Sequence, residues 1–361
     1  MIHVVVGTKA QMIKIAPVMA GLQAQQIDYN FIFTGQHKNT MDELRENFGI
    51  RKPDAVLYHG KDVTGLFQML FWMVRILFKT LFHRSEIFSK QGKNDIVLVH
   101  GDTFSALLGA LMGKAAGKKV GHVESGLRSF NIFHPFPEEI TRILVFYLSD
   151  YYFCPGDWAL QNLDKFKGVK INTRFNTLVD SLELANKKIN NAVVEIPAAP
   201  YAVVSLHRFE NIFNKKVFRQ MIDYLLETSN TMQLLFILHP PTQEKLESYK
   251  FIDLLEEAEK IQLRPRYDYF KFIKLIQKSE FLITDGGSNQ EEAYYLGKPT
   301  ILFRRATERQ EGVGANVVIS NYDINIIRDF VTRYQEYARP PVQPEKSPTE
   351  IIIANLTQFI D

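Results

Sequence analysis

Residues 284–299 read TDGGSNQEEAYYLGKP, which is the end of a strand, a tight glycine loop and the start of a helix. Apolar runs typical of buried strands flank this unit at 281–284 and 300–303. A strand, a crossover helix and a second strand in this order favour a parallel sheet covered by helices on both faces.

The same alternation extends in both directions from this unit. In the first half, strands are predicted at 2–6, 29–33, 96–100, 120–124 and 151–154, and helices at 13–23, 41–48, 105–116 and 138–148. The pattern then restarts, with strands at 201–206, 234–238, 281–284 and 300–303, and helices near 215–228, 270–278 and 290–296. This repetition predicts an α/β fold with two wound domains.

Length supports two domains, because 361 residues exceed what one ordinary core accommodates. The region 185–200 is rich in Asn, Ala and Pro, which is typical of a domain boundary. A proline-rich stretch, ARPPVQPEKSP at 338–348, sets off a last helix predicted at 349–359. We therefore expect an N-terminal domain of residues 1–178, to which 349–361 returns, and a second domain of residues 179–348.

Composition narrows the function classes. Apolar residues make up 46% and charged residues 23%, the balance of a globular protein, and the net charge of +3 leaves no electrostatic footprint for nucleic acid. The single cysteine, Cys154, excludes a disulfide within the chain and is expected to be a small buried apolar residue. The N-terminus begins a strand without a leader segment, so a cytoplasmic location is expected.

Residues 63–82, VTGLFQMLFWMVRILFKTLF, form a long apolar run. Gln68, Arg75 and Lys79 interrupt it and penalise insertion across a membrane. Its aromatic residues widen the apolar face beyond an ordinary helical stripe, so we expect a helix buried in a homodimer interface. A helix lying on a membrane surface is the alternative interpretation.

Polar or glycine-rich clusters follow five of the predicted strands. They occupy 7–9, 100–103, 122–128, 207–208 and 285–288. Ligands of open α/β sheets bind beyond the carboxyl ends of the strands. We therefore expect one composite site in a cleft between the two domains.

The glycine loop is the candidate anion site. Gly286 and Gly287 allow a close turn, and the helix beyond presents unpaired N–H groups that suit a diphosphate. The pattern is neither GxGxxG nor a Walker loop, so neither a dinucleotide nor ATP is indicated. An ordinary turn, with Asp285 or Ser288 capping the helix, remains open.

Three carboxylates at strand ends or in loops are candidate acids and bases: Asp102 in HGDT, Glu124 in HVESGLRS and Glu138 in PFPEEITR. Removal and return of a carbon-bound proton needs such groups, and a departing phosphate needs positive charge. The available cations are Lys9, Lys14, Arg142 and His207. A surface pair of Glu138 with Arg142, and a helix cap at Asp102, remain the simpler alternatives.

The sequence contains no HExxH, CxxC or paired-Asp signature, so we expect neither a metal nor a cofactor.

Eight motifs, in order along nearly the whole chain, match one known family. They are GTKAQMIKIAP at Gly7, FTGQH at Phe33, VHGDT at Val99, GHVESGLRS at Gly121, PFPEEITR at Pro135, HRFEN at His207, TDGGSNQEEAYYLGKP at Thr284 and ATERQEG at Ala306. The sequence resembles the non-hydrolysing UDP-N-acetylglucosamine 2-epimerases, which have the GT-B architecture of two Rossmann-like domains facing across a cleft. The resemblance implies a polysaccharide-precursor isomerase that interconverts UDP-N-acetylglucosamine and UDP-N-acetylmannosamine by eliminating and re-adding UDP, without a cofactor.

The resemblance also implies residue roles. In the second domain, Phe272 is expected to stack on uracil, Glu292 to hold the ribose, and Gly286, Gly287 and Ser288 to receive the diphosphate, with His207 and Arg309 assisting at the phosphates. In the first domain, Asp102, Glu124 and Glu138 are expected to serve in acid–base chemistry, with Arg142 beside them and Lys14 near the ligand.

The chain departs from the family pattern at several positions. GTKAQ replaces the usual GTRPE, so Lys9 stands where a guanidinium would grip phosphate. Gln36 and His37 match only part of an allosteric site for a second UDP-sugar. Relatives act on sugars with a second acetamido group or a uronate, so the exact sugar stays open. A hydrolysing epimerase, a GT-B glycosyltransferase and a catalytically silent UDP-sugar-binding protein are the competing hypotheses.

Overall fold

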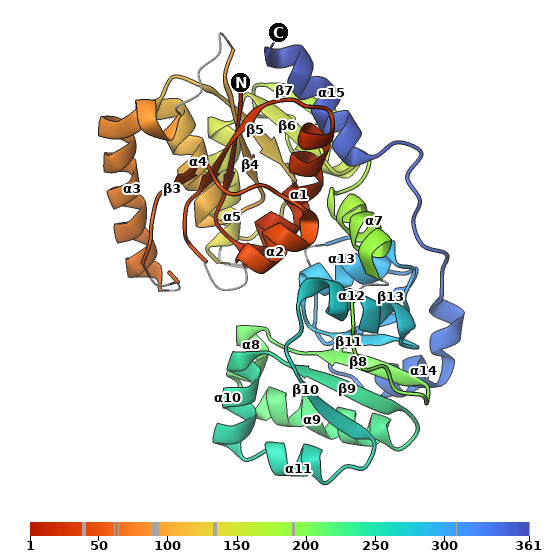
Figure 1. Ribbon diagram of the computed structural model, residues 1–361. Helices are drawn as coiled ribbons and strands as arrows, with labels where there is room; N and C mark the ends of the chain where they lie inside the picture. The colour runs from red at the N-terminus through yellow and green to blue at the C-terminus, as the bar shows by residue number, and fades with distance from the viewer. Residues whose placement is uncertain are drawn as a thin grey trace. The chain divides into compact units, whose positions relative to one another are not determined.

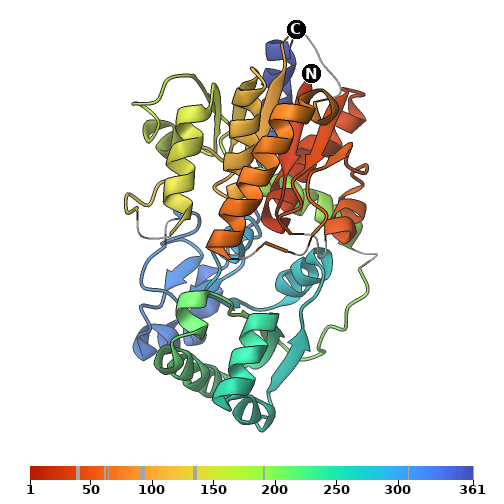
Figure 2. The same cartoon turned by 90° about the vertical axis from the view of Figure 1, so that its left-hand side faces the viewer.

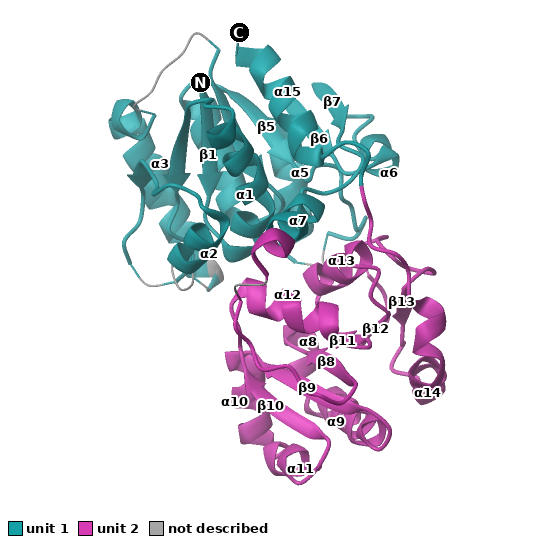
Figure 3. Cartoon of the chain, turned by 45° about the vertical axis from the view of Figure 1, so that its right-hand side comes forward, with its two compact units in different colours: residues 1–184, 344–361 teal, residues 185–343 magenta. Residues whose placement is uncertain are grey.

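The computed structural model describes residues 1–37, 41–60, 62–63, 65–88, 94–132, 136–189, 192–307 and 309–360 (Figure 1). Two motif positions of the sequence analysis, Pro135 and Glu308, lie outside this part of the chain. The chain divides into two compact units, coloured separately in Figure 3. Unit 1 comprises Met1–Leu184 and Pro344–Asp361, and unit 2 comprises Ala185–Gln343.

Unit 1 is built on a seven-stranded parallel sheet of order β3-β2-β1-β4-β5-β6-β7. The strands are β1 (Ile2–Val6), β2 (Tyr29–Phe33), β3 (Ala55–Val56), β4 (Ile96–His100), β5 (Lys119–Val123), β6 (Tyr151–Cys154) and β7 (Val169–Asn172). Five of them match the predicted strands closely. The two edge strands, β3 and β7, were missed because they are short and carry few buried side chains, so they lack the apolar run that marks a central strand.

Helices pack on this sheet, and the helix that ends the chain packs on α1 (Figure 1). They are α1 (Lys9–Ala24), α2 (Met41–Phe48), α3 (Leu66–Ile87), α4 (Phe104–Ala115), α5 (Glu138–Leu148), α6 (Asp157–Gln161), α7 (Leu178–Lys188) and α15 (Pro348–Ile360). The predicted return of the last helix to the first domain is therefore confirmed.

The unit boundary falls within α7, later than the predicted limit of residue 178. The first turns of α7 are bonded to unit 1: Ser181 Oγ donates to the carbonyl of Ile13 at 2.6 Å, and Asp180 accepts from the N–H of Thr349 at 2.8 Å. The return to unit 1 at Pro344 likewise comes earlier than the predicted 349. These long-range bonds involve polar side chains whose partners are distant in sequence, so local composition did not reveal them.

Unit 2 has a six-stranded parallel sheet of order β10-β9-β8-β11-β12-β13. Its strands are β8 (Tyr201–Ser205), β9 (Gln233–Leu238), β10 (Ile261–Pro265), β11 (Leu282–Thr284), β12 (Thr300–Leu302) and β13 (Val317–Ile319). Its helices are α8 (Phe209–Ile212), α9 (Lys215–Ser229), α10 (Pro240–Tyr249), α11 (Ile252–Glu256), α12 (Tyr269–Lys278), α13 (Gly287–Tyr295) and α14 (Ile324–Arg333), followed by the 3₁₀ turn η2 (Tyr334–Tyr337).

Both sheets reverse their strand order at a topological switch point. In unit 1 the order reverses between β1 and β4, and in unit 2 between β8 and β11. Ligands of doubly wound folds bind beyond the carboxyl ends of the strands at this point. Each unit therefore has one edge at which functional side chains are expected.

Candidate active site

The predicted site residues fall into two groups, one in each unit. Lys9, Lys14, Asp102, Glu124, Glu138 and Arg142 belong to unit 1, and His207, Phe272, Gly286, Gly287, Ser288, Glu292 and Arg309 belong to unit 2. Within unit 1, Asp102 and Glu124 lie in the loops after β4 and β5. The other four residues lie on helices: Lys9 and Lys14 on α1, and Glu138 and Arg142 on α5.

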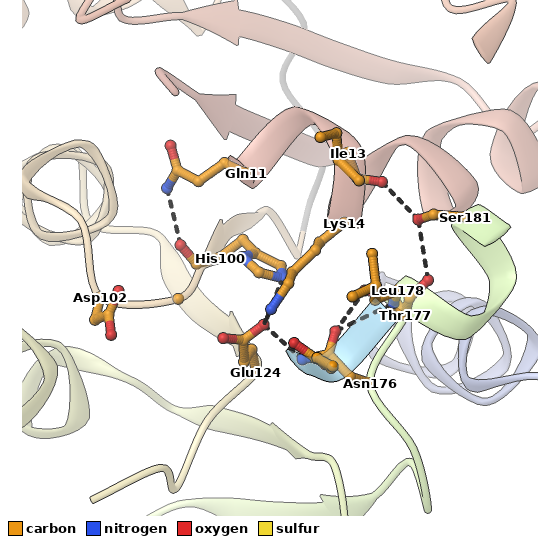
Figure 4. A network of polar contacts seen from close by, with 12 residues as sticks. Gln11, Ile13, Lys14, His100, Asp102, Glu124, Asn176, Thr177, Leu178 and Ser181 are labelled. Carbon is orange, nitrogen blue, oxygen red and sulfur yellow. Dashed lines mark hydrogen bonds and ion pairs between the residues drawn. The ribbon is translucent and has the colours of Figure 1, made fainter. Parts of the chain in front are cut away.

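Glu124 is the centre of a buried polar network in unit 1 (Figure 4). Its Oε2 accepts a hydrogen bond from the Lys14 ammonium and another from Asn176 Nδ2 at 2.5 Å. Both charged side chains are about 95% buried, each with a side-chain exposure of 5%. Two donors on one buried oxygen fix the position of this carboxylate. Sequence reasoning found Lys14 and Glu124 but missed Asn176.

The backbone at Glu124 is also unusual. Its φ of +61° lies in the left-handed region, which costs a non-glycine residue about 1 kcal/mol or more. The bonds to Lys14 and Asn176 offset that cost and keep the carboxylate aimed as Figure 4 shows. Strain of this kind clusters at functional sites.

Local sequence explains how α1 brings Lys14 to this position. Thr8 caps the helix by accepting from the N–H of Gln11, and Gln11 Oε1 accepts in return from the N–H of Thr8 at 3.2 Å. Gln11 Nε2 also donates to the carbonyl of His100 at 2.8 Å, which ties the start of α1 to the end of β4. Gly7 is required before this cap, because a Cβ there would lie 1.9 Å from Ser105 Oγ. Lys9 begins α1 and is half-buried.

Two neutral histidines support the same loops. Burial lowers the pKa of His100 to about 4 and that of His122 to about 4. His122 Nε2 lies 2.8 Å from the carbonyl of Gly101, and its Nδ1 lies 3.1 Å from Ser125 Oγ. The neutral tautomer with the proton on Nε2 satisfies both contacts. His100 Nε2 lies 3.5 Å from Glu124 Oε2, so an uncharged imidazole faces the carboxylate.

Arg142 forms ion pairs with two further carboxylates of unit 1, those of Asp102 and Glu139. Its guanidinium bonds to Asp102 Oδ2 and, at 2.7 Å, to Glu139 Oε2. Burial would lower the pKa of Arg142, but Asp102 and Glu139 outweigh it and hold that pKa above its ordinary value. Asp102 keeps 26% of its side chain exposed, whereas Glu139 is fully buried. Asp102 therefore remains accessible to a ligand.

Glu139 was missed because the sequence analysis favoured its neighbour Glu138. Burial would raise the pKa of Glu139, but bonds from the Ser129 N–H, Arg128 and Arg142 lower it below the ordinary value. Glu139 is thus the carboxylate that holds Arg142 in place, and the expected pairing of a glutamate with Arg142 occurs at spacing i,i+3 inside the protein. Glu138 begins α5 and is half-buried.

In unit 2, Asp285 organises the loop after β8. Its carboxylate is fully buried and accepts from the N–H of His207 at 2.9 Å, the N–H of Arg208 at 3.1 Å and Asn211 Nδ2 at 3.0 Å. Burial lowers the pKa of His207, whose ring stacks on His239 with centroids 4.6 Å apart. Asp285 is therefore committed to this loop and does not cap α13, so that simpler alternative is wrong.

The start of α13 has the features of an anion site. Gly286 is its N-cap, and no side chain caps the helix N-terminus. A Cβ at Gly286 would lie 2.6 Å from His207 Cε1 and 2.8 Å from Asn289 Oδ1, so glycine is required for this close approach. Gly287 is half-buried and Ser288 is exposed. The first N–H groups of α13 therefore lie beside His207, in the arrangement that favours a bound phosphate.

The remaining predicted residues of unit 2 lie on α12, α13 and the loop after β12. Glu292 is buried and accepts from Asn289 Nδ2 at 2.9 Å. Arg309 Nη1 bonds to the buried Glu291 at 2.7 Å. Burial, with Glu292 and Glu291 adding to it, raises the pKa of Tyr269 well above its ordinary value. Phe272 is half-buried on α12.

Comparison with known proteins is consistent with this geometry. The family model described as UDP-N-acetylglucosamine 2-epimerase matches residues 20–345. The chain belongs to this family. With two parallel Rossmann-like sheets and structural neighbours of the same family, the predicted GT-B fold class is confirmed.

Individual members of the family are similar along nearly their whole length. A UDP-N-acetylglucosamine 2-epimerase of Methanocaldococcus jannaschii is 32% identical over 348 residues, which cover 91% of this chain and 90% of that protein. A UDP-2,3-diacetamido-2,3-dideoxy-D-glucuronate 2-epimerase of Pseudomonas aeruginosa is 32% identical over 330 residues, covering 87% of each. The crystal structure of the Neisseria meningitidis enzyme bound to UDP-GlcNAc has a TM-score of 0.82 at 28% identity and covers 99% of each chain.

Proposed function

We propose that this family member epimerises C2 of UDP-N-acetylglucosamine, or of a close UDP-2-acetamido sugar, by the non-hydrolysing route. The observation that carries the proposal is the buried Lys14–Glu124 pair of unit 1, together with the partly exposed Asp102 that the buried Arg142 holds. Related proteins from Methanocaldococcus jannaschii and Neisseria meningitidis bear the name of this activity.

The chemistry assigned to unit 1 is proton transfer at C2. A carboxylate removes the C2 proton, the C1–O bond breaks, and UDP leaves with the bonding electrons to give 2-acetamidoglucal. UDP then re-adds at C1 while a proton returns to the other face of C2. Asp102, Glu124 and Glu138 are the candidates for these two transfers. Lys14 and Arg142 place a positive charge beside Glu124 and Asp102, and an ionised carboxylate is the form that accepts a proton.

The role assigned to unit 2 is nucleotide binding. The uncapped N–H groups at Gly287 and Ser288 receive the diphosphate, with His207 and Arg309 at its oxygens. Phe272 stacks on uracil and Glu292 holds the ribose hydroxyls. Lys9 supplies a single ammonium where the family pattern has a guanidinium, so it holds phosphate as a point charge.

We further propose that the enzyme is cytoplasmic and that its product is used in surface-polysaccharide synthesis. The homodimer expected from the apolar segment 63–82 remains a prediction, and light scattering at micromolar concentration measures it. Among the described residues, no helix is long and apolar enough to span a membrane. The sequence did not predict activation by a second UDP-sugar, because Gln36 and His37 match only part of such a site. Of these two residues, Gln36 is buried and accepts a hydrogen bond from Ser105 Oγ at 2.6 Å.

The decisive experiment is NMR of UDP-N-acetylglucosamine with the enzyme in D₂O. The expected result is a UDP-linked C2 epimer with deuterium at C2 in both sugars. Free N-acetylmannosamine with UDP would identify the hydrolysing reaction instead, and turnover only with an added acceptor would identify a glycosyltransferase. Epimerisation that retains the C2 hydrogen would contradict the elimination mechanism. A parallel assay with UDP-2,3-diacetamido-2,3-dideoxy-glucuronate distinguishes the sugar, since a relative is named for that substrate.

A further inference from the structure

Two backbone carbonyls lead into Asp102, those of His100 and Gly101, and each accepts a hydrogen bond from a buried side chain. Gln11 Nε2 donates to the carbonyl of His100 at 2.8 Å, as Figure 4 shows. His122 Nε2 lies 2.8 Å from the carbonyl of Gly101. Gln11 is 1% exposed and His122 is fully buried. Two elements distant in sequence, α1 and β5, thus bind the two peptide groups before the candidate acid.

The partners of Gln11 show which end of its amide is the donor. Its Oε1 accepts from the backbone N–H groups of Gly7 at 3.0 Å and Thr8 at 3.2 Å, so its nitrogen faces the carbonyl of His100. An ionised glutamate has the acceptor oxygens but no donor. Gln11 stands where the family pattern GTRPE has its glutamate, so the donor at this position is a property of this chain.

His122 connects the two loops that carry candidate acids. Its Nδ1 lies 3.1 Å from Ser125 Oγ, and burial lowers its pKa to about 4, so the ring is neutral near pH 7. With the Ser125 hydroxyl donating to Nδ1, the single ring proton lies on Nε2 and bonds to the carbonyl of Gly101. Gly101 directly precedes Asp102, and Ser125 directly follows Glu124. One imidazole therefore sets how far apart the two loops lie.

The carboxylate of Asp102 is held separately from its backbone. Arg142, on α5, bonds to the carboxylate. Figure 2 shows α5, in yellow, in one layer with α4 and α3, whereas α1 packs against α2 and α15. Arg142 thus fixes the carboxylate from one layer of helices, and Gln11 fixes the backbone from another. Two separate anchors leave little freedom for the direction in which the acid points.

We propose that Gln11 and His122 are positioning residues of the epimerisation. By donating to two consecutive carbonyls, they aim Asp102 and set its distance from Glu124, another candidate for proton transfer at C2. Both act through Asp102 and not on the sugar. The assignment rests on the proposed function. A reacting group displaced by about 1 Å loses rate by up to about a hundredfold, so loss of either donor should be felt in kcat.

The test variants remove the donors with the least change of shape. Gln11→Glu keeps an oxygen for the N–H groups at the start of α1 but cannot donate to His100 while it is ionised. His122→Asn has an amide too short to reach the carbonyl of Gly101, whereas His122→Gln keeps a nitrogen near the position of Nε2. In Gln11→Glu and His122→Asn, kcat should fall by about ten- to a hundredfold with KM unchanged. In His122→Gln, kcat should stay within about threefold of the wild type.

Two readouts separate positioning from loss of folded protein. With substrate deuterated at C2, a misplaced acid slows the proton transfer, so the isotope effect on kcat should be larger in Gln11→Glu and His122→Asn than in the wild type. Protonation of the new glutamate restores a donor to the carbonyl of His100, and burial favours that protonated form. The ratio of the kcat of Gln11→Glu to that of the wild type should therefore rise as the pH falls from about 8 to about 6. His100, Lys14 and Glu124 are common to both enzymes, so this ratio isolates residue 11.

Two matched controls make the same substitutions away from Asp102. Gln23, near the end of α1, donates to the carbonyl of Gly49 at 3.0 Å and accepts from the Tyr29 hydroxyl at 2.7 Å. His3, near the start of β1, is fully buried, and burial lowers its pKa to about 4. Gln23→Glu and His3→Asn should lower the free energy of unfolding in urea but keep the wild-type kcat and isotope effect.

Wild-type kcat and isotope effects in Gln11→Glu and His122→Asn would overturn the proposal and leave the proposed function intact, as would equal losses of kcat in the two controls. If His122→Asn does not fold, Ser125→Ala takes its place, because it removes the hydroxyl that fixes the tautomer. Its kcat should fall about threefold, and an unchanged kcat would count against the proposal equally. A wild type that does not exchange the C2 hydrogen in D₂O would instead overturn the proposed function, and the assignment of both residues with it.

Discussion

Asp102 and Asp285 occupy matching places in the two units, yet they are held in opposite ways. Each follows the strand on one side of its switch point, β4 in unit 1 and β11 in unit 2. Asp102 keeps 26% of its side chain exposed and bonds to one guanidinium, that of Arg142. Asp285 is fully buried and accepts from two backbone N–H groups and Asn211. The same residue type at the same edge thus serves as an accessible acid–base candidate in one unit and as a loop anchor in the other.

The largest expected effect is on catalysis at Asp102. Asp102→Asn should lower kcat by two or more orders of magnitude, the scale of a positioned acid or base. It should lower the free energy of unfolding by about 1–3 kcal/mol, because the buried Arg142 loses a charged partner but keeps Glu139. Initial rates by NMR and urea titration measure the two quantities. Glu124→Gln and Glu138→Gln should lower kcat on the same scale. Near-normal rates in all three variants would show that other residues carry the chemistry.

Acid should destabilise the fold around Asp102. His100 and His122 have folded-state pKa values of about 4, while their unfolded values are near 6.5. Between these values the unfolded state binds more protons, so stability is lost as pH falls from about 6.5 to about 4, by up to roughly 3 kcal/mol for each histidine. Urea titrations at pH 7, 6, 5 and 4.5 would follow this loss. His122→Gln should flatten the profile, and an unchanged slope would contradict a neutral buried His122.

The anchor role of Asp285 predicts a stability effect. Asp285→Asn should lower the free energy of unfolding by about 1–3 kcal/mol, because an amide has one acceptor oxygen and cannot satisfy the N–H groups of His207 and Arg208 together with Asn211. KM should rise as the His207 loop shifts. Asp268→Asn is the matched control, since Asp268 caps α12 and Asn caps equally well. If Asp285→Asn and Asp268→Asn have equal free energies of unfolding, Asp285 does not anchor the His207 loop.

The smallest expected effect is a change of KM at Gly286, the residue that follows Asp285. Gly286→Ala should raise KM for the UDP-sugar about tenfold with less change in kcat, because the added Cβ would lie 2.6 Å from His207 Cε1 and the phosphate loop must move. Gly65→Ala is the control, since the nearest atom to its Cβ would be 3.6 Å away. If both variants keep the wild-type KM, the start of α13 does not receive the diphosphate.

The sequence alone was sufficient to predict the two-domain α/β fold class and the positions of the central strands. Each central strand is a short run of buried apolar residues, so local pattern and final structure agree there. The motifs also pointed to Asp102 and Glu124, because strand-end loops carry function in parallel sheets. They pointed as well to Lys14 on α1 and Arg142 on α5. The motif resemblance further indicated the family to which the chain belongs.

Tertiary structure decided which side chains are partners. Asn176 and Lys14 meet at Glu124 across 52 and 110 positions of sequence, and Glu139, not Glu138, is the buried partner of Arg142. It also decided that Asp285 serves the loop of His207, 78 residues earlier, and that the outer face of α3 is left uncovered within unit 1. Hydrogen-bond partners and burial depend on which strands become neighbours in the sheet. Periodicity along the chain reports only which faces are apolar, and it does not identify the residue that a side chain will meet.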